Sequence, residues 1–97
     1  MLFRSIDGTK ISVNIGGQFN VMNSLAAVNA ARALGVSLHV IARGLANASA
    51  VDGRFEAINA GQDFEVIVDY AHTPDALIRV LESTRSLMTM NSQLIVV

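Results

Sequence analysis

Apolar and polar residues alternate in two short runs near the start of the chain, residues 2–5 and 10–15. Asp7-Gly8 lies between these runs, and this dipeptide is typical of a tight turn. Because alternation with a period of two indicates an extended backbone with one buried face, the runs predict two strands of an antiparallel hairpin.

Two helices are predicted after this hairpin. Residues 20–34 are rich in alanine, which has the highest helix propensity, and Gly35 supplies the expected helix stop. A second helix is expected to begin after Ser37 as its N-cap and to end near Asn47, because apolar residues recur there at the spacing of one helix face. These residues are Leu38, Ile41, Ala42 and Leu45.

The second half of the chain opens with two further apolar runs, residues 55–58 and 64–69, around a polar five-residue connection. The connection is rich in Asn, Gly and Asp, so the runs predict a second antiparallel hairpin. A third helix is expected to start with Thr73 as its N-cap and Pro74 at the first helical position. Proline is favoured there because the N–H that it lacks would have no partner in the helix.

The apolar spacing predicts that this third helix continues to residues 91–92, with Arg79, Glu82 and Arg85 paired on its outer face. Residues 93–97 (QLIVV) then predict a buried strand. A strand, helix and strand in this order form a β-α-β unit, which is almost always a parallel, right-handed crossover. No turn follows this apolar run, so we expect the chain to be a piece of a longer protein.

The composition narrows the classes of function. Hydrophobic residues make up 52% of the chain and charged residues 15%, which argues against disorder and suits a large buried fraction. The formal net charge is −1 without a basic cluster, so nucleic acid is not an expected partner. No apolar run approaches the ~20 residues that span a bilayer. Cysteine is absent, which excludes disulfide bonds and thiolate chemistry. Residues 46–54 are small and polar, and such a segment favours a domain boundary.

Polar side chains gather where residues 64–69 give way to the third helix. Ligands of open α/β sheets bind beyond the carboxyl ends of strands, which makes Asp69 and His72 candidates. Asp69 accepts hydrogen bonds either from a ribose diol or from backbone N–H groups of its own turn. His72 either donates to a phosphate at the helix start or is an ordinary surface histidine. Asp75 is best explained by the helix dipole.

Three further candidates lie outside this loop. Arg54 follows a glycine at the proposed boundary, and its guanidinium either clamps a phosphate or pairs with a nearby carboxylate. Asn20 and Asn23, three residues apart at a helix start, face the same side, and capping explains Asn20 better than Asn23. The chain contains neither a P-loop nor a G-x-G-x-x-G motif, and its two histidines lie in separate elements, so no metal site is predicted.

Three segments, GQFNVMNSLAAVNAARALGV, VDGRFEAI and VIVDYAHTPDAL, resemble in this order the Mur ligases of bacterial peptidoglycan synthesis. The resemblance covers residues 11–97. DYAHTPDAL looks most like the MurE type, which adds the third amino acid to UDP-N-acetylmuramoyl-L-alanyl-D-glutamate. Folylpolyglutamate and cyanophycin synthetases share a D-x-A-H-x-P core and remain an alternative. A non-catalytic nucleotide-binding or protein-interaction module is another.

The resemblance implies an α/β fold in two parts. Residues 1–51 would end a central P-loop ATPase domain, and residues 52–97 would open a Rossmann-like C-terminal domain with a β-hairpin and a β-α-β unit. In the family ATP lies between these two domains. The residues that the resemblance assigns to the ATP site are Asn23 and Asn20 at the adenine, Arg54 at the phosphates, Asp69 at the ribose and His72 near the nucleotide.

The implied activity is an ADP-forming ligation of an acid to an amino acid. The substrate carboxylate attacks the γ-phosphate of ATP to give an acyl phosphate, which the incoming amine then attacks. Mg²⁺ and a P-loop lysine stabilise charge in such transfers, and both the lysine and the Mg²⁺ ligands lie outside this chain. We therefore expect no catalytic residue, no metal ligand and no ligase activity in these 97 residues alone.

The same resemblance implies the substrates and the location of the full-length enzyme. It would act in the cytoplasm on UDP-N-acetylmuramoyl-dipeptide and an amino acid, without nucleic-acid or membrane partners. The amino acid, diaminopimelate or lysine, is left open.

Overall fold

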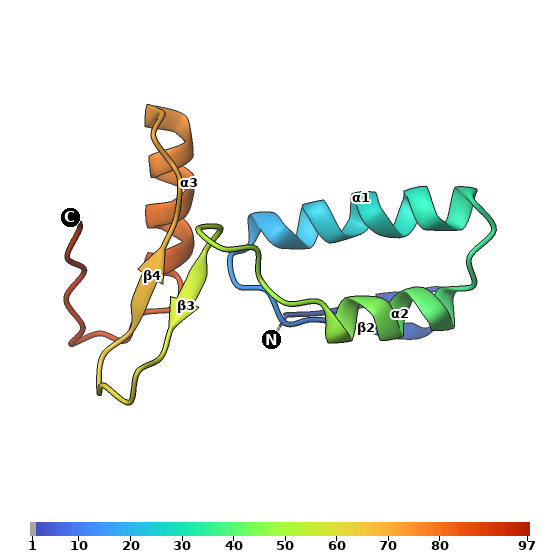
Figure 1. The fold of residues 1–97 in the computed structure, drawn as a ribbon, viewed down its shortest axis with the longest axis horizontal. Helices are drawn as coiled ribbons and strands as arrows, with labels where there is room; N and C mark the ends of the chain where they lie inside the picture. The colour runs from blue at the N-terminus through green and yellow to red at the C-terminus, as the bar shows by residue number, and fades with distance from the viewer. Residues whose placement is uncertain (1) are drawn as a thin grey trace.

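The computed structural model describes residues 2–97, with side chains from Ser5 onward, as a mixed α/β chain of two small sheets and three helices. The elements are β1 (Leu2–Ile6), β2 (Thr9–Val13), α1 (Phe19–Ala33), α2 (Leu38–Asn47), β3 (Glu56–Ile58), β4 (Val66–Val68) and α3 (Pro74–Arg85). Figure 1 shows two lobes joined by the segment between α2 and β3. We call β1, β2, α1 and α2 the first lobe, and β3, β4 and α3 the second.

The first hairpin forms as predicted. β1 and β2 pair antiparallel, with Ile6 opposite Thr9 at the closed end. Asp7 and Gly8 have φ angles of 47° and 78°, and positive φ at both central positions is the mark of a type I′ turn, whose twist matches that of the strands. The Asp7 carboxylate also lies 3.0 Å from the Arg32 guanidinium, which links this turn to the last turn of α1.

The two helices of the first lobe start and end within one residue of their predicted bounds. Gly35 has a φ of 83°, and its N–H donates to the Arg32 carbonyl at 2.9 Å while the Val36 N–H donates to the Ala31 carbonyl at 3.0 Å. These two bonds are those of a Schellman motif. Ser37 occupies the N-cap position of α2, as predicted, although its hydroxyl makes no capping bond.

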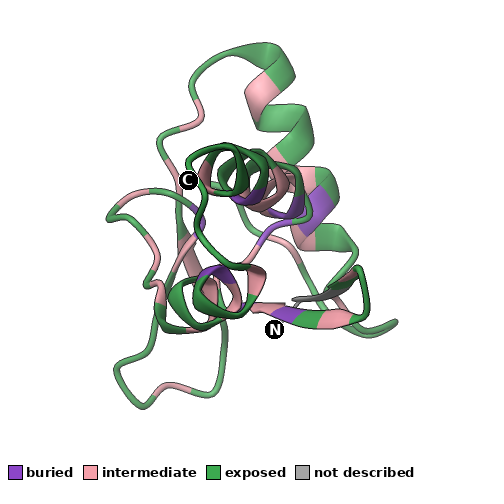
Figure 2. Ribbon diagram, turned by 90° about the vertical axis from the view of Figure 1, so that its right-hand side faces the viewer, coloured by how far each residue is buried: buried purple, intermediate pink, exposed green. Residues whose placement is uncertain are grey.

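The core of the first lobe lies where β2, α1 and α2 meet, around the buried side chains of Ile11, Val28 and Ile41. Figure 2 shows buried positions on the facing sides of these elements and exposed positions over most of the remaining ribbon. The large buried fraction expected from the composition is therefore wrong for these residues. Each lobe consists of a short hairpin packed with only one or two helices. Few apolar side chains are therefore buried.

The second hairpin also forms, with Glu56 opposite Val68 and Ile58 opposite Val66. β3 and β4 are both shorter than predicted. β3 begins one residue late because Phe55 has a φ of 48° and cannot belong to an extended strand. After β4 the chain turns into α3.

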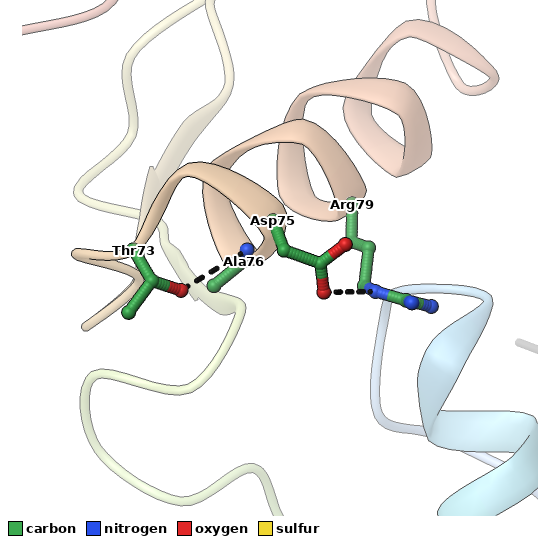
Figure 3. A network of polar contacts seen from close by, with 4 residues as sticks. All are labelled: Thr73, Asp75, Ala76 and Arg79. Atoms are coloured by element: carbon green, nitrogen blue, oxygen red, sulfur yellow. Dashed lines mark hydrogen bonds and ion pairs between the residues drawn. The ribbon is translucent and has the colours of Figure 1, made fainter.

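The start of α3 agrees with the sequence. Thr73 is its N-cap, and the hydroxyl oxygen accepts the Ala76 N–H at 3.3 Å (Figure 3). Pro74 opens the helix and Asp75 lies in its first turn, where the helix dipole favours a negative charge.

The end of α3 differs from the prediction. The helix stops at Arg85, and the N–H groups of Leu87 and Met88 bond to carbonyls three residues back, so the chain leaves the helix through a tight turn. Residues 93–97 form no strand, and the side chain of Ile95 is 77% exposed.

The predicted buried strand and β-α-β unit are therefore wrong for the described residues. A strand requires ladder bonds to a neighbour, and β4 pairs within residues 2–97 only with β3. Figure 1 shows the terminal segment running apart from both strands.

Candidate functional site

A cleft of about 480 Å³ lies between the two lobes, and we call it the interlobe cleft. The loop before α1 and the first turns of α1 form one wall, while the segment before β3, the end of β4 and the start of α3 form the other. Its polar lining residues are Asn20, Asn23, Arg54, Asp69 and Arg79. Its apolar lining residues are Ile15, Phe19, Val51, Ala71, Ala76 and Val80. The structure thus brings together four of the five candidate site residues and leaves His72 outside the lining.

Asp69 is held at the second wall by the backbone. Its Oδ2 atom accepts the N–H of Phe55 at 2.8 Å, and its Oδ1 atom accepts the N–H of Ala71 at 2.7 Å. The interpretation that Asp69 binds backbone N–H groups is therefore confirmed, with one donor from its own turn and one from the segment before β3. A carboxylate has about four acceptor positions, so these two bonds leave Asp69 able to accept from a hydroxyl in the cleft.

Arg54 lies in a tight turn of the segment between the lobes. Its N–H donates to the Val51 carbonyl at 2.9 Å, and the neighbouring Gly53 has a φ of 70°. The guanidinium carbon lies 5.7 Å from the centre of the Tyr70 ring, a cation–π contact. Among the described residues no carboxylate lies within ion-pair distance of Arg54, so the carboxylate-pairing interpretation is wrong and its N–H donors remain open to the cleft.

His72 is exposed and contacts Tyr70 rather than the cleft. The two rings meet edge to face with their centres 4.9 Å apart, and the His72 Nδ1 atom lies 2.9 Å from the Tyr70 carbonyl oxygen. Because a carbonyl oxygen only accepts, Nδ1 is the donor where this contact is a hydrogen bond.

Asn20 and Asn23 lie on the same face of α1, as predicted. The Asn20 amide donates to the Gly16 carbonyl, and the Asn23 amide donates to the Asn20 side-chain oxygen at 3.1 Å. Asn20 thus fastens the loop before the helix and orients Asn23. The side chain of Asn23 keeps one amide N–H and its oxygen exposed in the cleft, a donor and an acceptor side by side.

Arg79 was not predicted at this site. The expected pairing of Arg79 with Glu82 is wrong, because the Arg79 Nε–H donates to the Asp75 Oδ2 atom at 2.9 Å. This bond and the charge of Asp75 raise the pKa of Arg79 above its ordinary value. The guanidinium extends toward α1 and lines the cleft (Figure 3). The four-residue spacing between Asp75 and Arg79 is the sequence signal that predicts such a pair.

Over residues 2–97, no helix combines the length and the apolar character needed to cross a membrane. Nor does this part of the chain hold three or more His, Cys, Asp or Glu side chains grouped so as to bind a metal ion.

Residues 53–97 match the family model described as Mur ligase, glutamate ligase domain. This segment includes Arg54, Asp69 and the start of α3. Residues 53–97 thus match the Mur ligase family, and the resemblance drawn from the motifs is confirmed.

Curated relatives agree with this assignment over most of the chain. It is 48% identical over 86 residues to the UDP-N-acetylmuramoyl-L-alanyl-D-glutamate–2,6-diaminopimelate ligase of Geobacillus thermodenitrificans, covering 89% of this chain and 18% of that enzyme. The enzymes of the same name from Fusobacterium nucleatum and Gloeobacter violaceus are 45% identical over 78 residues and 54% identical over 70 residues. These alignments cover 80% and 71% of this chain, and 16% and 14% of those relatives. The chain thus spans less than a fifth of the length of these ligases.

Proposed function

We propose that the interlobe cleft is one side of the ATP site of a ligase that adds 2,6-diaminopimelate to UDP-N-acetylmuramoyl-L-alanyl-D-glutamate. The observation that carries the proposal is the shared position of Asn23, Arg54 and Asp69 on a single cavity. These three residues lie far apart in the sequence. Diaminopimelate is proposed rather than lysine because the relatives named above carry that substrate in their names.

The lining of the cleft suits the parts of a nucleotide. The exposed amide of Asn23 offers a donor and an acceptor to the edge of a base, and the apolar wall that includes Phe19 and Val51 suits the faces of the base. The Asp69 carboxylate accepts from ribose hydroxyls, and the Arg54 guanidinium matches the oxygen atoms of a phosphate. The cleft therefore carries a complementary group for each part of ATP.

The two lobes support the proposed division of the chain into two domains. We assign residues 1–51 to the end of a central P-loop domain and residues 52–97 to the start of a Rossmann-like C-terminal domain. Support comes from the position of the cleft between the lobes and from the family match, which begins at residue 53. His72 would approach the nucleotide from outside the cleft, next to Tyr70 and Arg54.

Mg²⁺ would be held mainly by groups outside this chain. The Asp69 carboxylate is the acidic group that lines the cleft, and both its oxygen atoms already accept backbone N–H bonds, which does not suit a metal ligand set. Bound to the nucleotide, Mg²⁺ neutralises phosphate charge. The part of the site in this chain binds and orients the nucleotide, and the proposed enzyme is cytoplasmic, where ATP and the UDP-linked substrate are available.

The proposal is tested with the full-length ligase that contains this chain. We expect ATP-dependent phosphate release that requires both the UDP-dipeptide and diaminopimelate. Arg54→Ala and Asp69→Ala should each raise the KM for ATP about tenfold or more, because each removes hydrogen bonds from a charged group. Arg43→Ala is the matched control, since Arg43 is an exposed arginine of α2 away from the cleft.

Two results would contradict the proposal. One is a full-length protein without ATP-dependent ligation of these substrates. The other is an ATP KM that neither Arg54→Ala nor Asp69→Ala changes. We also expect the 97-residue chain by itself to release no phosphate from ATP, since the P-loop lies outside it.

A further inference from the structure

Phe55 has the most unusual conformation among the residues near the cleft. Its φ of 48° lies in the left-handed region, which bulky residues rarely adopt, and its side chain is only 4% exposed. Such a conformation persists only where the surrounding structure holds it, and it is often found at functional sites. The contacts of Phe55 therefore indicate what this conformation provides.

The ring of Phe55 joins the second lobe to the first. It meets the ring of Phe19 edge to face, with the ring centres 5.6 Å apart and an interplanar angle of 79°. Gly16 also lies against the ring, because an added Cβ atom there would stand 2.8 Å from the Phe55 Cδ1 atom. Gly16 and Phe19 thus form a socket in the first lobe, and only a residue without a side chain leaves room for the ring.

The backbone of Phe55 faces the candidate nucleotide site. Its N–H donates to the Asp69 Oδ2 atom at 2.8 Å, while β3 begins only at the next residue, Glu56. The same residue therefore inserts a ring into the first lobe and holds the carboxylate that lines the cleft. Movement of the ring in its socket would move this N–H and release one oxygen of Asp69.

We infer that Phe55 is a positioning residue: its ring, fixed in the Gly16–Phe19 socket, aligns the Asp69 carboxylate for the nucleotide ribose. The inference rests on the proposed ATP site. It means that the contact between the lobes and the orientation of the ribose acceptor depend on a single side chain. Phe55 acts through Asp69 and needs no contact with the nucleotide.

A double-mutant cycle in the full-length ligase tests this inference. Phe55→Ala and Asp69→Ala should each raise the KM for ATP about tenfold, as expected for the loss of a hydrogen bond to a charged group, and leave the KM for the UDP-dipeptide unchanged. The double variant should have the same ATP KM as Asp69→Ala. Phe64→Ala is the matched control, because Phe64 lies in the same hairpin, is 65% exposed and lies outside the cleft.

A second variant covers the case in which Phe55→Ala does not fold. Gly16→Ala keeps Phe55 and displaces its ring, and Gly16 itself has no left-handed backbone that alanine would strain. Gly16→Ala should raise the ATP KM in the wild-type background and have no further effect with Asp69→Ala. Phe55→Leu should restore most of the affinity by refilling the socket.

Two outcomes would overturn the inference, and they differ in meaning. If the effects of the Phe55 or Gly16 variants multiply with that of Asp69→Ala, or are absent, Phe55 does not act through Asp69. The ATP site itself then stands. If Asp69→Ala alone leaves the ATP KM unchanged, the proposed site fails and the inference fails with it.

Discussion

Asp69 is anchored from two directions, and its two backbone donors determine what the side chain can do. The N–H groups of Phe55 and Ala71 each donate to a different carboxylate oxygen. The residue is partly buried, so these donors have limited access to water. A carboxylate satisfies both, because it accepts and never donates when ionised.

Asp69→Asn should therefore destabilise the second lobe although the shape of the side chain is nearly unchanged. The amide nitrogen of Asn would face one of the two backbone N–H groups and leave that donor without an acceptor. We expect a loss of roughly 1–3 kcal/mol in the free energy of unfolding of this chain, measured in urea.

Asp52→Asn is the control for this change, since Asp52 is exposed in the turn before β3. Its effect should stay below about 0.5 kcal/mol. Equal stability of Asp69→Asn and the unchanged chain would show that these two backbone bonds do not contribute to folding.

The sequence reveals some of these residues and not others. Asp69 is found because it follows a strand, and Arg54 is found because it follows a turn glycine. The donor to Asp69 is Phe55, fourteen residues earlier, and nothing in the local pattern indicates that its backbone would be left-handed. The contact of Phe55 with Gly16 and Phe19 is equally hidden, because it depends on how two separate lobes meet.

Helices and hairpins form where local signals are sufficient. The Asp7-Gly8 turn, the Gly35 stop and the Thr73-Pro74 start each depend on the conformation of a few neighbouring residues, and each is predicted correctly. The strand expected at residues 93–97 is not formed, because apolar sequence alone does not supply the pairing partner that a strand needs.

The two N-cap positions should respond differently to substitution. Thr73 accepts a capping bond from Ala76, whereas Ser37 makes no such bond. Thr73→Ala is expected to cost about 1 kcal/mol of folding stability, and Ser37→Ala should cost clearly less. Urea unfolding of both variants measures the difference, and a larger loss for Ser37→Ala would show that the capping bonds are assigned incorrectly.

Two glycines should give changes of opposite sign. Gly35 ends α1 with a φ of 83°, while Gly44 lies within α2 with no other atom near an added Cβ. Gly35→Ala should destabilise the chain by about 1 kcal/mol, because alanine resists the left-handed conformation.

Gly44→Ala should instead stabilise the chain by about 0.5–1 kcal/mol, through higher helix propensity. Thermal unfolding monitored by circular dichroism measures both glycine variants. A shift of the midpoint in the same direction for both substitutions would contradict the roles of Gly35 and Gly44 in these helices.

The candidate site exists only where the two lobes meet. Asn20 and Asn23 come from α1, Arg54 from the connecting segment and Asp69 from the second lobe. Under the proposed function, neither lobe alone would carry groups for the base, the ribose and the phosphates. Nucleotide binding should therefore depend on the contact between the lobes, to which the buried ring of Phe55 contributes.

A crystal structure of the full-length ligase with Mg²⁺ and a non-hydrolysable ATP analogue tests this arrangement most directly. We expect the analogue in the interlobe cleft, with a ribose hydroxyl in hydrogen-bond contact with the Asp69 carboxylate and a phosphate in contact with the Arg54 guanidinium. An analogue bound elsewhere, with Asp69 bonded only to the N–H groups of Phe55 and Ala71, would contradict it.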